Sequence, residues 1–129
     1  MATTRRTQND PKVSHPKRGE IYLTSLDPTL GREIKKTRPA LVIQNDVSNR
    51  LSEMTIVAPI TSTVRFPINP VHVLLAASPE TGLTVTSVAM INHVRAVDRV
   101  RLIKRLGAVD KQTLEQVDEA IKVSFGLDL

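Results

Sequence analysis

Polar side chains stand at several places where the sequence predicts that strands end. They supply one guanidinium, three hydroxyls, one amide and one imidazole, from Arg38, Thr61, Ser62, Ser87, Asn92 and His93. Taken singly, each has an ordinary structural explanation, because such residues also form turns, surface ion pairs and satisfied strand positions. The individual residues therefore leave a structural and a functional interpretation open.

Several kinds of active site are absent from the sequence. The three histidines, His15, His72 and His93, have no Cys, Glu or His neighbour at metal-ligand spacing, so we expect no metal site. There is no glycine-rich phosphate loop, nucleophile elbow or paired-carboxylate motif, and the absence of cysteine excludes thiolate chemistry. The sequence thus contains no motif for a metal or a cofactor, and we expect neither.

The charge of the chain is unevenly distributed. The formal net charge is +5, with eleven lysines and arginines against five acids in residues 32–105, but two against five in residues 110–129. A basic centre suits an anionic ligand, although unpaired surface cations are also common. A base-stacking platform is not expected, because the only aromatic residues are Tyr22, Phe66 and Phe125.

The chain of 129 residues has the length of one domain, which we place at residues 18–129. Residues 1–17 are polar, contain two prolines and show no apolar period, which predicts a disordered basic tail. No apolar run reaches the ~20 residues of a membrane helix, and the N-terminus has no secretory apolar stretch. We expect a soluble, intracellular protein.

Short apolar runs predict a mainly β domain. Strands are expected from about residue 18 to 26, at 40–43 and at 54–58, with a loop at 27–37 and a turn at 45–49. Pro59 cannot donate to a sheet ladder, so we expect a bulge or strand end just before Ile60.

The second half of the chain predicts further strands and one helix. Strands are expected at 71–75 and 86–91, and residues 95–105 suggest a strand end, a short helical turn and another strand. Asp110 is placed to cap an amphipathic helix with apolar residues at 114, 117 and 121, ending near Gly126. These elements indicate a small twisted antiparallel sheet or half-open barrel with a C-terminal helix.

The order of several motifs resembles the MazF/PemK family. The matching stretches are RGEIY at 18–22, LDP at 26–28, GREIKKTRPALVI at 31–43, ND at 45–46, VAPITS at 57–62, PVHV at 70–73, GL at 82–83, Ser87 and VRAVDRVRL at 94–102. The resemblance continues into the final helix, so it covers nearly everything after residue 17.

The resemblance implies a toxin of a type II toxin–antitoxin pair. Such toxins have an SH3-like half-open barrel of antiparallel strands (MazF/CcdB-like) with added helices, form homodimers in the cytoplasm and bind a MazE-like antitoxin. They cleave single-stranded mRNA at short specific sequences and without a metal. The products have 2′,3′-cyclic phosphate and 5′-hydroxyl ends, so the 2′-OH of the substrate is the nucleophile. The acidic, disordered segment of the antitoxin lies along the RNA groove, which agrees with the basic centre.

Carried over by position, the catalytic arginine and threonine of the family fall on Arg38 and Thr61. A guanidinium grips two phosphate oxygens at once, and a hydroxyl adds a neutral hydrogen bond. The loop at 27–37 would cover the site with Glu33, Lys35 and Lys36 as RNA contacts. Residues 64–70 form a second candidate specificity loop. The other expected substrate contacts are Ser62, Ser87, Asn92 and His93.

His93 stands where many family members have a glutamine. An arginine stays protonated at ordinary pH and is a poor base, whereas imidazole titrates near neutrality. We therefore hypothesise that His93 contacts RNA and assists proton transfer.

Two other functions remain open. The same barrel serves, in a related family, as a non-enzymatic toxin that binds DNA gyrase, and fold alone does not decide function. A passive RNA-binding module would have the same basic groove but would leave RNA intact.

Overall fold

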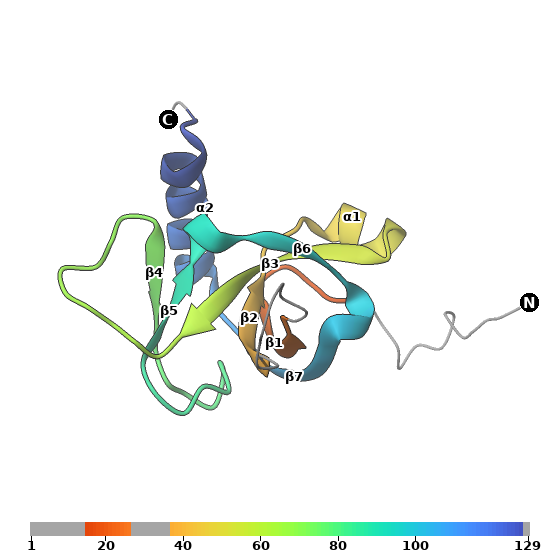
Figure 1. The fold of residues 1–129 in the computed structure, drawn as a ribbon, viewed down its shortest axis with the longest axis horizontal. Coiled ribbons are helices and arrows are strands. Elements are labelled where there is room, and N and C mark those ends of the chain that lie inside the picture. The colour runs from red at the N-terminus through yellow and green to blue at the C-terminus, as the bar shows by residue number, and fades with distance from the viewer. Residues whose placement is uncertain (1–14, 27–36, 128–129) are drawn as a thin grey trace, which may run out of the picture.

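The computed structural model describes residues 15–26 and 37–127. In chain order its elements are β1 (Glu20–Ser25), β2 (Thr37–Val42), α1 (Asp46–Leu51), β3 (Met54–Thr61), β4 (His72–Leu75), β5 (Ser87–Met90), the 3₁₀ turn η1 (Ile91–His93), β6 (Arg95–Asp98), the 3₁₀ turn η2 (Arg99–Arg101), β7 (Leu102–Ala108) and α2 (Lys111–Phe125). The predicted succession of short strands with one C-terminal helix is confirmed (Figure 1).

All described strand pairings are antiparallel. The strands lie in the order β4-β5-β3-β2-β1-β7, and β6 also pairs with β3. Strands β5 and β6 both pair with the same side of β3. Their registers against β3 differ by three residues, which is the length of the turn η1 that connects them. Because β6 and β7 do not pair in the described part of the chain, the sheet stays open, as predicted for a half-open barrel.

Alternating residues of the central strands face two separate cores. On β2, Ala40 and Val42 pack inside the barrel with Val57, whereas Leu41 packs in the larger core beneath α2. This larger core reaches Val117 of α2, which stands along β4 and η1 (Figure 1). Strand β3 contributes to both cores, which explains why its apolar residues are nearly continuous.

The expected interruption at Pro59 is wrong, because β3 runs through this residue. The N–H of Ile43 donates to the carbonyl of Ile56, so the pairs alternate and the Pro59 nitrogen points away from β2. On that side of β3 the pairing with β6 ends at Val57, and the pairing with β5 starts at Ile60. Pro59 therefore lies in the unpaired stretch of β3 beside η1. No ladder hydrogen bond is therefore lost.

The expected turn at residues 45–49 is also wrong, because α1 occupies most of this stretch. The side chain of Asn45 caps the helix by accepting a hydrogen bond from the Ser48 N–H at 2.8 Å. Asn49 is fully buried, where its side-chain oxygen accepts from the Thr55 hydroxyl at 2.7 Å. Asparagine can initiate either a turn or a helix, and the buried partner on β3 decides between them.

The predicted ends of α2 are confirmed. Asp110 accepts a hydrogen bond from the Thr113 N–H at 2.8 Å, and hydrogen bonds from the side chain and backbone of Thr113 lower the pKa of Asp110. Gly126 ends the helix in the left-handed conformation with φ +71°. No helix in residues 15–26 or 37–127 is long and apolar enough to span a membrane.

The segment between β4 and β5 crosses to β7 and touches its backbone. The Ala108 N–H donates to the carbonyl of Glu80 at 2.8 Å. A Cβ on Gly82 would overlap the carbonyl of Leu106, and a Cβ on Gly107 would overlap the carbonyl of Glu80. Gly82 also has φ +74°, so this contact requires glycine for both space and conformation.

Candidate active site

The antiparallel pairing of β2 with β3 places the beginning of β2 beside the end of β3. Ala40 lies opposite Pro59, and the same register carried two residues further brings Arg38 opposite Thr61. Directly opposed residues of an antiparallel pair have Cβ atoms about 5 Å apart. Both residues border one cavity, which agrees with this register.

Arg38 and Thr61 also belong to the same face of the sheet. By strand alternation Arg38 shares the face of Ala40, and Thr61 shares that of Val57, and both of these apolar residues pack inside the barrel. The two side chains thus extend the barrel interior at its open end. This arrangement is what a common phosphate would require.

The hydroxyl of Thr61 has one local partner. Its oxygen accepts a hydrogen bond from the Thr63 N–H at 3.2 Å, which shapes the chain as β3 ends. A hydroxyl that accepts in this way keeps its own proton for donation. Thr61 and Arg38 are both half-buried, so a ligand in the cavity can reach them.

The cavity has a volume of about 500 Å³ and opens at the ends of these strands. Because it lies at the end of the sheet, residues from both faces contribute to its wall. The lining residues are Thr37, Arg38, Pro39, Ile60, Thr61, Ser62, Gly82, Leu83, Thr84, Val85, Ser87 and Leu106. This mixture of hydroxyls, one cation and apolar surface can hold an anionic group beside a flat apolar one.

The two predicted serines both line the cavity. Ser62 is exposed just after β3, so its side chain is accessible to a ligand. Ser87 is buried, and its hydroxyl donates to the carbonyl of Val85 at 2.9 Å. Ser87 therefore has a structural bond that supports the wall, and its contact with substrate stays a prediction.

The predicted residues Asn92 and His93 lie outside the lining of this cavity. Both are exposed on η1. This turn lies beside the short stretch of β3 that pairs with neither β6 nor β5. Their position is near the end of β3 but not on the wall that Arg38 and Thr61 form. Their contact with substrate also stays a prediction.

The predicted contacts Glu33, Lys35 and Lys36 lie outside the described residues, as do most of the 27–37 loop and residues 1–14. Thr37 is the exception in the loop, since it begins β2 and lines the cavity. The RNA contacts of the loop remain a prediction, and so does the disordered basic tail at residues 1–17.

Sequence reasoning missed the wall formed by Gly82, Leu83, Thr84 and Val85. Gly82 and Leu83 belong to the stretches that resemble the family, but the sequence assigns them no role, because nothing in the types of these four residues indicates chemistry. The only local signal is Gly82, whose conformation and contact with β7 hold the segment in place. Its approach to the end of β2 depends on the tertiary fold.

An ion pair lies on the β1–β7 side of the barrel. The Arg105 Nε atom lies 2.8 Å from the Glu20 carboxylate, which also accepts a hydrogen bond from the Tyr22 hydroxyl at 3.0 Å. Burial, helped by the Glu20 charge, raises the pKa of Tyr22 to about 12. The Tyr22 hydroxyl therefore stays protonated to a higher pH than that of an exposed tyrosine.

Residues 17–125 match the family described as PemK-like, MazF-like toxins of type II toxin–antitoxin systems. The chain is 38% identical over 111 residues to endoribonuclease EndoA of Bacillus subtilis strain 168, an alignment covering 86% of this chain and 95% of that protein.

Solved structures show the same fold. The Mycobacterium tuberculosis toxin MazF-mt6 superposes with a TM-score of 0.72 at 27% identity, over 85% of this chain and 99% of that one. A MazE–MazF crystal structure from Deinococcus radiodurans superposes with a TM-score of 0.72 at 24% identity, over 88% and 97% of the respective chains.

Proposed function

Since the chain belongs to the family of PemK-like, MazF-like toxins of type II toxin–antitoxin systems, we propose that it is an endoribonuclease that cleaves single-stranded mRNA. The observation that carries this proposal is the meeting of Arg38 and Thr61 on one cavity at the end of β2 and β3. A gyrase-binding protein has no need for this pair.

The reaction uses the 2′-OH of the substrate as nucleophile. The 2′ oxygen bonds to phosphorus while the bond from phosphorus to the 5′ oxygen breaks. The 2′ proton passes to a base, and the departing 5′ oxygen gains a proton. The products are a 2′,3′-cyclic phosphate and a 5′-hydroxyl, and none of these steps requires a group outside the chain, the RNA and water.

Arg38 and Thr61 stabilise the charge that develops on the phosphate. The Arg38 guanidinium donates to the non-bridging oxygens, and the Thr61 hydroxyl donates to one of them. Removing one preorganised donor of this kind lowers kcat by about 10²–10³-fold in enzymes that stabilise oxyanions. His93 is our candidate for proton transfer, since Arg38 stays protonated.

The partners follow from the same surface. We assign a MazE-like antitoxin to this chain because an acidic segment suits the basic middle of the sequence, and because the D. radiodurans structure contains MazE with MazF. We also assign a homodimer and a cytoplasmic location, where its mRNA substrate lies.

The test is to incubate the purified full chain with a long mRNA in EDTA and to determine the chemistry of the fragment ends. We expect cleavage with 5′-hydroxyl ends, and a loss of about 10²-fold or more in Arg38→Ala and in Thr61→Val. Arg50→Ala is the matched control, because Arg50 is exposed at the end of α1 and outside the cavity.

Other outcomes overturn the proposal. Intact RNA together with inhibited DNA supercoiling would indicate the gyrase-binding alternative. Intact RNA that is bound with strong salt dependence would indicate a passive RNA-binding module.

A further inference from the structure

Arg95 reaches across the open end of the barrel. It lies on β6 directly opposite Val57, whose side chain faces the barrel interior, so Arg95 shares that face. Its Nη1 atom donates to the carbonyl of Leu26 at 2.9 Å, just after β1 ends. Since β6 and β1 lie on opposite sides of the β2–β3 pair, this side chain spans the end of the barrel where β2 begins, outside the lining of the cavity that Arg38 borders.

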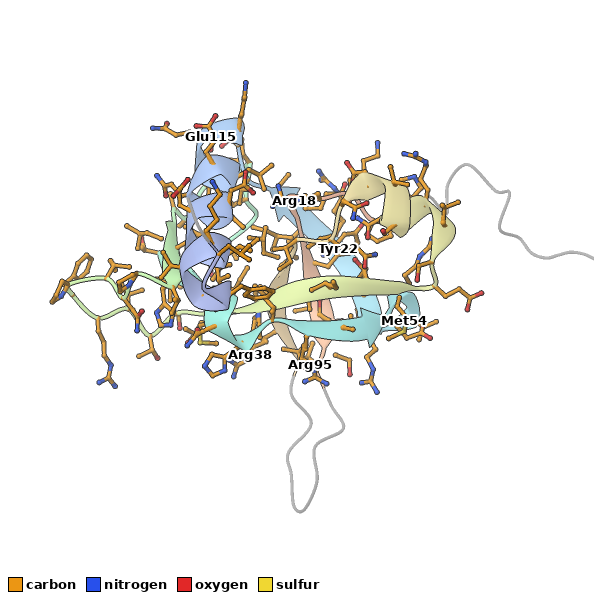
Figure 2. The ribbon with its side chains drawn as sticks, turned by 90° about the horizontal axis from the view of Figure 1, so that it is seen from above. Arg18, Tyr22, Arg38, Met54, Arg95 and Glu115 are labelled. Carbon is orange, nitrogen blue, oxygen red and sulfur yellow. The ribbon has the colours of Figure 1, made fainter. Side chains whose placement is uncertain are left out.

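Arg101 approaches the same place from another element. From η2 its Nη1 atom makes a long hydrogen bond of 3.4 Å to the carbonyl of Ser25. Ser25 lies opposite Thr37, the residue before Arg38. Two guanidiniums thus anchor on consecutive carbonyls beside the start of β2, and Figure 2 shows Arg38 and Arg95 along the same edge of the molecule.

No carboxylate of the described residues balances these charges. The ion pairs found in residues 15–26 and 37–127 involve Arg18, Arg105 and Lys122, none of which belongs to this group. A backbone carbonyl is a neutral acceptor and occupies one of the five N–H donors of a guanidinium. With respect to the described residues, each arginine is therefore held in place by one neutral acceptor and keeps further N–H donors.

We propose that Arg95 and Arg101 form a second phosphate subsite, which binds an RNA phosphodiester next to the one at Arg38 and Thr61. The anchored guanidiniums are preorganised, so little side-chain entropy is lost when a phosphate binds. This subsite rests on the proposed function for its place along the RNA, and it contributes to binding rather than to bond cleavage.

The test separates binding from cleavage. Single-stranded RNA of randomised sequence, carrying 2′-O-methyl groups throughout, has no 2′-OH nucleophile and serves as the probe. Its affinity for the full chain is measured by fluorescence anisotropy at several salt concentrations. The slope of log K against log salt is negative, and each lost phosphate contact makes it shallower by roughly 0.7 for single strands.

We expect this slope to be shallower by about 0.7 in Arg95→Gln and in Arg101→Gln, and by about 1.4 in the double variant. Arg95→Lys keeps the charge and should keep the wild-type slope. Arg50→Gln is the control for the loss of one exposed cation and should leave the slope unchanged. With cleavable mRNA, the double variant should raise KM about tenfold with little change in kcat, whereas Arg38→Ala lowers kcat.

A purely structural role of the two arginines predicts a different result. The Gln variants would then lower the melting temperature while the salt slope stayed at the wild-type value, and this result would overturn the subsite. Because the probe is never cleaved, a wild-type chain without nuclease activity would refute the proposed function but leave the slope measurement valid.

Discussion

At the residue scale, the proposed site depends on two side chains with different roles. Arg38 supplies a fixed positive charge, whereas Thr61 supplies a neutral donor whose oxygen is already held by the Thr63 N–H. Neither can serve as the base, because one stays protonated and the other is a very weak acid. The proton must therefore leave through another group.

His93 provides the first prediction. If its imidazole takes part in proton transfer, the rate of mRNA cleavage should depend on pH. In His93→Gln this dependence should disappear and the rate at neutral pH should fall by about 10²-fold. The measurement is a pH–rate profile at saturating mRNA.

His72→Gln is the control, since His72 lies on β4 away from the cavity. A flat wild-type profile with a fully active His93→Gln enzyme would exclude the proton-transfer role. Such a result would leave Arg38 and Thr61 as stabilisers and would direct the search for the base to the substrate or to water.

At the element scale, the wall of the cavity depends on how one connection packs against a strand. The segment between β4 and β5 reaches the cavity because Gly82 lies against the backbone of Leu106 on β7. A glycine there allows both the positive φ and the close approach, which no residue with a side chain combines. The lining residues Thr84 and Val85 follow directly.

Gly82→Ala should therefore lower the free energy of unfolding by about 3 kcal/mol or more, from backbone strain and overlap together. Gly126→Ala is the matched control, because Gly126 has a similar φ but an open surrounding, and strain alone should cost about 1 kcal/mol. Urea unfolding of both variants measures the difference. Equal losses in the two variants would contradict the role given to the close approach.

The elements also show what the sequence could predict. The ends of α2 were predictable because Asp110 and Gly126 act locally, through one hydrogen bond and one backbone conformation. The continuity of β3 through Pro59 was not, because the position without an N–H donor faces a gap that only the three-residue η1 creates. The helix α1 was missed because Asn49 finds its partner on β3.

The site follows the same division. Resemblance placed Arg38 and Thr61, and the pairing of β2 with β3 brings these two residues to one cavity. Arg95 was not singled out, because its importance comes from a bond to Leu26, sixty-nine residues earlier in the chain. Contacts of that separation cannot be inferred from residue type and local spacing.

At the scale of the whole molecule, pH acts on stability through Tyr22. Its pKa is raised from 10.0 to about 12 in the folded chain, mainly by burial. Between these two values the unfolded chain loses a proton that the folded chain keeps, so the free energy of unfolding falls as the pH rises. Below pH 10.0 both states are protonated, and the contribution is complete.

We therefore expect the stability of the wild type to decline more steeply than that of Tyr22→Phe from pH 10.0 to about 12. Tyr22 is the only tyrosine and there is no tryptophan, so ultraviolet absorbance of tyrosinate reports its ionisation directly. The test combines this titration with unfolding curves at each pH. Parallel stability curves for the two proteins would contradict the assignment.

Strand β3 is shared by the barrel interior and by the core beneath α2. Neither the barrel interior nor the core beneath α2 can unfold while the other stays folded, because both contain residues of β3. Arg38 lies on β2 beside this strand, and Thr61 is the last residue of β3, so the geometry of the proposed catalytic pair and cooperative folding depend on the same strand. A chain loosened in either half should lose its toxicity before it loses its secondary structure.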